Sequence, residues 1–112
     1  MAKLYDQFIS SLEQKNIELY DSLLHEDYQF VRHQTNSVME RAQMIEMVKM
    51  MFSAEGLESL SRRCVYENED ILVEHSVIDF PDGTREAIMG VHHLRDGKII
   101  KTETGATLIS KD

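Results

Sequence analysis

The stretch that decides the fold runs Val91-His92-His93-Leu94-Arg95-Asp96-Gly97-Lys98-Ile99. Asp and Gly tolerate the positive φ angles that a two-residue type I′ turn requires, and strand-forming residues stand on either side of them. The pattern predicts two antiparallel strands joined at Asp96 and Gly97. Because successive side chains of a strand point to opposite faces, His92 and His93 cannot share a metal ion. We expect His92 to face the interior.

Two further turn signals divide the second half of the chain. They are Glu67-Asn68-Glu69-Asp70 and Pro81-Asp82-Gly83-Thr84, both clusters of residues that favour turns. Together with Asp96-Gly97 they predict a meander of four antiparallel strands, at 57–66, 71–80, 85–94 and 99–109.

The first half of the chain carries helical patterns instead. Apolar residues recur at helical spacing over 4–12, and Asn16 is a favourable N-cap for a second, short helix. An alternating segment at 28–32 predicts a strand, and a third helix ends near Gly56. That helix begins either with a capping box at Ser37 or at Glu40, after a short strand.

Helices first and strands afterwards indicate an α+β fold rather than a parallel α/β sheet. A chain of 112 residues has room for one hydrophobic core, so we expect a single domain over 1–112.

The charge balance disfavours two classes of partner. Lys and Arg number 12 against 20 Asp and Glu, and the formal net charge is −8. Nucleic acids and anionic membrane surfaces are bound by clustered Lys and Arg, which the chain lacks. The lone Cys64 excludes an intrachain disulfide and fits a reducing compartment, and no apolar run approaches a membrane span. We therefore expect a cytoplasmic protein with no nucleic-acid or membrane partner.

The order of these elements, over 3–109, resembles the nuclear transport factor 2-like superfamily, in particular its SnoaL-like branch. Three segments carry the resemblance: a helix end leading into a strand, a helix start with Glu40 where glycine is usual, and the hairpin quoted above. They are Leu24-His25-Glu26-Asp27-Tyr28-Gln29-Phe30, Met39-Glu40-Arg41-Ala42-Gln43-Met44-Ile45 and Val91–Ile99. The resemblance implies a cone-shaped fold, in which N-terminal helices pack on a curved antiparallel sheet that encloses a pocket.

Pairing the strands across their turns predicts which side chains face this pocket. A four-residue turn at 81–84 places His75 opposite Gly90, and the turn at 67–70 places Arg62 opposite His75. One face then carries Arg62, Cys64, His75 and His92, and the resemblance implies that this is the inner, concave face.

The last strand has two possible registers. A plain Asp96-Gly97 hairpin turns Lys101 and Glu103 inward, whereas a β-bulge turns Thr102 and Thr104 inward. We favour the bulge, because an inward Lys and Glu would need costly desolvation.

The outer face of the same strands is predicted to be apolar. It would carry Val65, Leu72, Ile78, Met89, Val91, Ile100 and Leu108. So much apolar surface is rarely left in water, and the resemblance also implies dimers, so we expect a homodimer through this face.

The candidate site residues follow from the predicted inner face and from the resemblance. His92 and His75 are the candidate catalytic residues, because imidazole titrates near neutral pH. Candidate ligand-binding residues are Phe8, Tyr28, Phe30, Arg32, Met51, Arg62 and Thr104. No group of residues has the spacing of a metal site, and no cofactor is expected.

The resemblance implies several possible activities, and the residues that each of them needs are present in this chain to different extents. Ketosteroid isomerisation needs a carboxylate base and two acidic hydrogen-bond donors, and the corresponding positions hold Arg32, Phe8 and Gly90. Cyclases of the SnoaL type are similar at His92, but the position of their acid falls near Thr104.

Dehydratase-like relatives use two histidines with tyrosines and an aspartate, a set that His75, His92, Tyr28 and Asp27 resemble. We therefore expect a small-molecule pocket for an apolar ligand bearing one or two oxygens, and the enzyme hypothesis is a histidine-based lyase or isomerase. The alternative is a non-catalytic dimeric binding or interaction module whose cone is filled by Met51, Phe30 and Phe8.

Overall fold

The computed structural model describes residues 3–110. Three helices and six strands follow one another along this part of the chain. In order they are α1 (Lys3–Glu13), α2 (Ile17–Leu23), β1 (Leu24–Arg32), β2 (Ser37–Glu40), α3 (Arg41–Ser53), β3 (Glu58–Glu67), β4 (Ile71–Asp79), β5 (Arg85–Arg95) and β6 (Lys98–Ile109).

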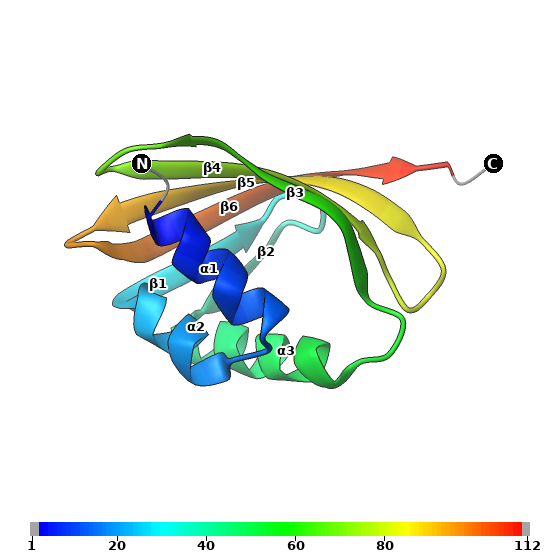
Figure 1. The fold of residues 1–112 in the computed structure, drawn as a ribbon, viewed down its shortest axis with the longest axis horizontal. Helices are drawn as coiled ribbons and strands as arrows, with labels where there is room; N and C mark the ends of the chain where they lie inside the picture. The colour runs from blue at the N-terminus through cyan, green and yellow to red at the C-terminus, as the bar shows by residue number, and fades with distance from the viewer. Residues whose placement is uncertain (1–2, 111–112) are drawn as a thin grey trace.

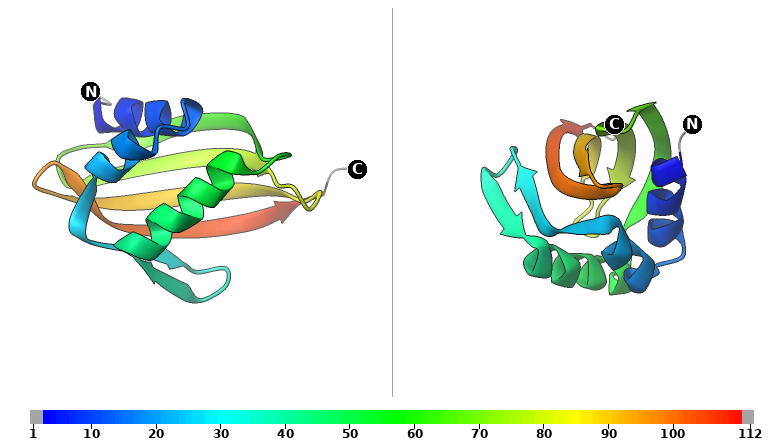
Figure 2. Two further views of the ribbon diagram at one scale, coloured as in Figure 1. Left: turned by 90° about the horizontal axis from the view of Figure 1, so that it is seen from below. Right: turned by 90° about the vertical axis from the view of Figure 1, so that its left-hand side faces the viewer.

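The six strands form one sheet in the order β2-β1-β6-β5-β4-β3. The pairing of β1 with β6 is parallel, and the other pairings are antiparallel. The sheet lies over the three helices in Figure 1, and Figure 2 shows how it curls around them. This is the α+β cone expected from the sequence. Within residues 3–110, no helix is long and apolar enough to cross a membrane.

The hydrophobic core lies between the helices and the concave face of the sheet. Its buried members come from all three helices and from β1 and β6: Phe8, Tyr20, Leu23, Leu24, Tyr28, Phe30, Met44, Val48 and Ile99. Strands β3, β4 and β5 contribute no residue to this buried cluster, and several side chains on their concave face line a cavity.

Local signals define the helix starts. The side chain of Asn16 accepts a hydrogen bond of 3.1 Å from the Leu19 N–H, so the predicted N-cap of α2 is confirmed. For α3, the second of the two predicted starts is correct, because a short strand, β2, precedes the helix. The side chain of Gln43 accepts a hydrogen bond of 2.9 Å from the Glu40 N–H and holds the first turn.

The β5–β6 hairpin agrees with its prediction. Asp96 and Gly97 have φ angles of 55° and 77°, as a type I′ turn requires. The register shifts by one residue at Ile100, which is a β-bulge. Thr102 therefore pairs with His92, and the favoured bulged register is confirmed.

The predicted register between β4 and β5 is wrong by one residue. The Phe80 N–H donates to the Thr84 carbonyl (2.8 Å), and the Gly83 N–H donates to the Phe80 carbonyl (3.0 Å). The loop therefore has three residues, 81–83, and ends with Gly83 at a φ of 90°. A three-residue loop with a left-handed last residue replaces the predicted four-residue turn. Glu74, not His75, lies opposite Gly90.

The same correction changes both faces of β4. His75 pairs with Met89 on the outer face, together with Val73, which pairs with Val91. Leu72 and Ile78, predicted on the outer face, share the inner face with Glu74.

On the flanking strands, Arg62 pairs with Ser76 rather than with His75, and Cys64 pairs with Glu74. Leu108 pairs with Glu86 and thus lies on the inner face, not on the outer face as predicted. Two inferences therefore need correction: the pairing of β4, which rested on turn length alone, and the outer placement of Leu108, which the bulged register of β6 excludes.

Candidate functional site

A cavity of about 510 Å³ lies between the concave face of the sheet and the helices. Its wall is mainly apolar and includes Phe8, Phe30, Met51 and Ile88. The aromatic and methionine side chains that were candidates for filling the cone line this space instead. A volume of this size is in the range of pockets that hold small molecules.

His92 lies in the cavity wall and is only 3% exposed. Its Nδ1 is 2.7 Å from Oγ1 of Thr102, and its Nε2 is 2.6 Å from Oε2 of Glu74. The ring of Phe8 packs beside it, with centroids 5.0 Å apart. When Glu74 is ionised it can only accept, so Nε2–H of His92 would donate to it, and Nδ1 of a neutral ring would accept from the Thr102 hydroxyl. His93 lies on the outer face, as predicted, and contacts Glu103.

Glu74 is the acidic partner that β4 supplies to the cavity. Its side chain is 13% exposed, and no hydrogen bond from residues 3–110 reaches its second oxygen, Oε1. The opposite position on β5 is Gly90, where an added Cβ would lie 3.3 Å from Oε2 of Glu74 and 3.4 Å from Nε2 of His92. The missing side chain of Gly90 thus leaves the space in which the carboxylate and the imidazole meet.

Two buried tyrosines extend this polar cluster. Tyr20 and Tyr28 are each 3% exposed, and Tyr28 interacts with both Tyr20 and Thr102. Burial raises the pKa of both phenols, although the two polar contacts of Tyr28 act in the opposite direction on its pKa. Both phenols therefore stay neutral at physiological pH and serve as hydrogen-bonding groups.

The raised pKa values predict a loss of stability in alkali. Above the unfolded pKa of about 10, the unfolded chain releases phenolic protons while the folded chain keeps them. The free energy of unfolding should then fall by about 1.4 kcal/mol per pH unit for each tyrosine. Urea titrations from neutral to alkaline pH should show a shallower fall in Tyr28→Phe, whereas Tyr66→Phe, which removes an exposed phenol, should match the wild type. An unchanged slope in Tyr28→Phe would contradict this assignment.

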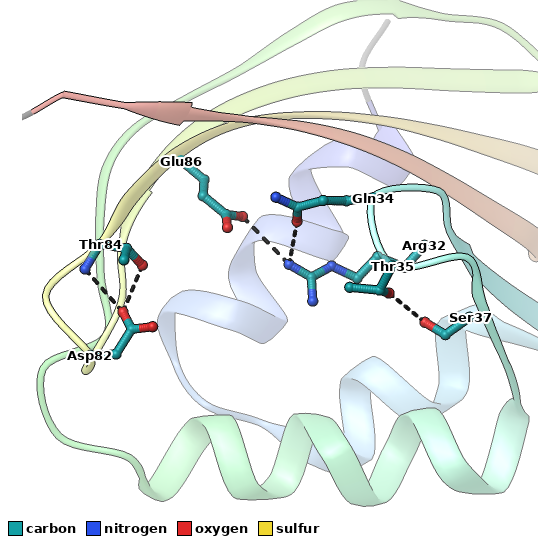
Figure 3. A network of polar contacts seen from close by, with 7 residues as sticks. All are labelled: Arg32, Gln34, Thr35, Ser37, Asp82, Thr84 and Glu86. Atoms are coloured by element: carbon teal, nitrogen blue, oxygen red, sulfur yellow. Dashed lines mark hydrogen bonds and ion pairs between the residues drawn. The ribbon is translucent and has the colours of Figure 1, made fainter.

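A second polar group lies in another part of the cavity wall. Figure 3 shows Arg32 from the end of β1 and Glu86 from β5 pointing toward one another beneath the sheet. Nη2 of Arg32 is 3.6 Å from Oε1 of Glu86, and it donates a hydrogen bond of 2.7 Å to Oε1 of Gln34. The Arg32 side chain is 37% exposed, so this end of the cavity is the more open to solvent.

Sequence comparison identifies the family. The family model of the SnoaL-like domain matches residues 5–102. The chain belongs to the SnoaL-like domain family. No curated protein matches this SnoaL-like chain significantly in sequence.

Solved structures share the fold of this SnoaL-like chain at low sequence identity. A nuclear transport factor 2-like protein of unknown function from Cytophaga hutchinsonii is 18% identical, with a TM-score of 0.75 over 93% of this chain and 87% of that one. A candidate ketosteroid isomerase from Kribbella flavida is 16% identical, with a TM-score of 0.76 over 98% and 79%. A candidate polyketide cyclase from Streptomyces antibioticus is 10% identical, with a TM-score of 0.75 over 94% and 90%. These likenesses show the fold alone.

The structure brings together most of the site residues predicted for this SnoaL-like chain. The cavity wall contains His92 and all seven predicted ligand-binding residues: Phe8, Tyr28, Phe30, Arg32, Met51, Arg62 and Thr104. His75 is absent from that wall, because the three-residue loop turns it to the outer face, so the predicted pair of histidines does not exist. Within residues 3–110, no group of side chains is arranged to hold a metal ion.

Sequence reasoning missed both acidic residues of the cavity. Glu74 was missed because its face depends on the length of the turn after β4, and Pro81-Asp82-Gly83 is a typical sequence for the three-residue loop that was not considered. Glu86 shares parity with His92 along β5, so the alternation that placed His92 was a sufficient signal to find it.

Proposed function

We propose that this protein binds a small, mainly apolar molecule carrying one or two oxygens, and that Glu74 transfers a proton to or from it. The observation that carries the proposal is the contact of 2.6 Å between Glu74 and His92 in the wall of an apolar cavity. An apolar pocket with a few converging polar groups is the usual form of a small-molecule site. The reaction class is a lyase or isomerase reaction that begins with removal of a proton from carbon.

In this proposal Glu74 is the base, and His92 is a positioning residue. Both ring nitrogens of His92 already have partners, so the imidazole is not free to contact a ligand directly. Its Nε2–H orients the carboxylate, and Oε1 of Glu74 is left to accept a proton from the ligand. The guanidinium of Arg62, which lies in the same wall, is a candidate to stabilise the negative charge that develops on a ligand oxygen.

The test uses nitrobenzisoxazole, a flat, uncharged compound that opens to a coloured cyanonitrophenolate when a base removes its ring C–H proton. The wild-type protein should accelerate this opening, and Glu74→Gln should lower the rate by about 100-fold or more, because Gln keeps the shape of the side chain but cannot take up the proton. His75→Gln is the matched control on the outer face of the same strand and should keep the wild-type rate. A Glu74→Gln rate equal to the wild-type rate would refute Glu74 as the base.

We also propose that the protein is a homodimer through the outer face of β4 and β5. Val73, Val91 and Met89 form an apolar strip there, and Met89 is 44% exposed. At the margins, Arg85 pairs with Asp79, and Glu103 pairs with His93. A two-fold axis through this strip would bring the same apolar patch of both protomers together, as an isologous dimer interface requires.

Light scattering at roughly 50 µM should give the mass of a dimer, and Met89→Glu should give the mass of a monomer, because it buries a charge in the interface. Met50→Glu, on the exposed side of α3, is the control and should remain dimeric. A monomeric wild type would contradict the proposed assembly.

A further inference from the structure

Glu86 is a buried acid whose hydrogen bonding is incomplete. The residue is 8% exposed, and within residues 3–110 its Oε1 has no hydrogen-bond partner. Arg32 is near, but its Nη2 is 3.6 Å from Oε1, beyond a good hydrogen bond, and is bound to Gln34. A buried carboxylate oxygen without a donor is costly, and such groups in proteins are usually satisfied. Oε1 itself has almost no exposed surface, but Glu86 is among the residues that line the cavity, so a modest rotation of its side chain would bring this oxygen to a donor inside the cavity.

The surroundings of Glu86 indicate the chemistry of that donor. The guanidinium of Arg32 lies on one side of the vacant acceptor and disfavours a second cation, so an ammonium group is a poor partner. A hydroxyl group fits both neighbours, because it donates to the carboxylate and accepts from the guanidinium. The wall next to this pair is apolar and includes Ile78, Phe80 and Ile88, which suits a hydrocarbon body.

The distance between Glu86 and Glu74 sets the length of a ligand that can contact both residues. Gly90 lies directly opposite Glu74, and Glu86 precedes Gly90 by four residues on β5. At about 3.3 Å per residue, the two acids are roughly 13 Å apart along the sheet. A ligand that reaches both must therefore be elongated.

We infer that Glu86 and Arg32 form a second anchoring point of the cavity, which binds a hydroxyl group at the outer end of an elongated apolar ligand. The inference rests on the proposed small-molecule function and adds a specificity-determining residue to it. Glu74 acts on the inner end of the ligand, and Glu86 selects the outer end. Ligands that lack the hydroxyl leave the carboxylate without its donor and bind more weakly.

The experiment compares three fluorescent probes of one shape. They are the acetylnaphthol whose acetyl and hydroxyl groups stand at opposite ends of the fused rings, its methyl ether, and acetylnaphthalene without the hydroxyl. The wild-type protein should bind the acetylnaphthol about tenfold or more tightly than either analogue. In Glu86→Leu the three affinities should agree within about twofold, and in Glu74→Gln the preference for the hydroxyl should persist. Equal binding of all three by the wild type, or a preference that survives in Glu86→Leu, would overturn the inference.

A stability measurement and the binding pattern of the wild type distinguish a failure of this inference from a failure of the proposed function. Glu86→Leu should unfold at the same urea concentration as the wild type or at a higher one, because it removes an incompletely paired buried charge; a large loss would assign Glu86 a structural role instead and overturn the inference. If none of the probes binds to the wild type, the small-molecule function itself is wrong, and the anchor is rejected with it. Binding of all three without discrimination leaves the proposed function standing and rejects Glu86 alone.

Discussion

Replacing His92 by alanine should destabilise the protein by about 3 kcal/mol or more. His92 is 3% exposed and connects Thr102 to Glu74, with contacts of 2.7 Å and 2.6 Å. Its removal leaves the Glu74 carboxylate without its donor and takes one of two polar contacts from the Thr102 hydroxyl, which still contacts Tyr28. The loss of a buried partner costs roughly 1–3 kcal/mol. The packing of the imidazole against Phe8 is lost as well.

The matched control is His93→Ala, one residue along the same strand. The His93 side chain is 41% exposed and loses a contact with Glu103 on the outer face. Exposed pairs of this kind contribute at most about 1 kcal/mol. Urea denaturation of both variants measures the difference, and a larger loss for His93→Ala than for His92→Ala would contradict the inward orientation of His92.

Leu72→Ala should be comparably severe, with a loss of about 3–5 kcal/mol in the free energy of unfolding. Leu72 is fully buried, lies on the inner face of β4 and pairs with His92. Leu72 also pairs with Glu67 on β3. The Glu67 carboxylate accepts hydrogen bonds from the N–H groups of Leu4 and Tyr5, so the first turn of α1 is attached to the sheet beside Leu72. Truncation of a buried leucine removes its transfer free energy and leaves a cavity that the surroundings fill only in part.

Val73→Ala, on the outer face, is the matched comparison for Leu72→Ala and should cost about 1 kcal/mol or less in the monomer. If Val73 is buried in the proposed dimer, its apparent cost should grow with protein concentration, whereas the cost of Leu72→Ala arises inside one protomer. Urea titrations at two protein concentrations measure both quantities. A small loss for Leu72→Ala would contradict the register of β4.

The contrast between these residues explains what sequence reasoning could and could not predict. The β5–β6 hairpin was predictable because Asp96-Gly97 specifies a two-residue turn, and the bulge followed from the cost of burying Lys101 and Glu103. The face on which His92 lies was therefore predictable. These signals are local, and each depends on only a few residues.

Strand β4 carries no comparable signal. Leu72 and Ile78 on one face are as apolar as Val73 and Val77 on the other, so alternation alone does not distinguish the inner face. Only the length of the turn that follows decides between Glu74 and His75. A sequence with polar residues on one face of β4 would have allowed the acidic partner of His92 to be predicted.

The three-residue loop at 81–83 has a consequence for how this protein could diversify. Insertion of a single residue there would shift the pairing of β4 by one position and exchange its two faces. His75 would then enter the cavity and Glu74 would leave it, although no residue of the wall had been substituted. The insertion of one codon in this loop would therefore replace the proposed carboxylate base by an imidazole. The length of this surface loop thus determines which titratable side chain of β4, a carboxylate or an imidazole, faces the cavity.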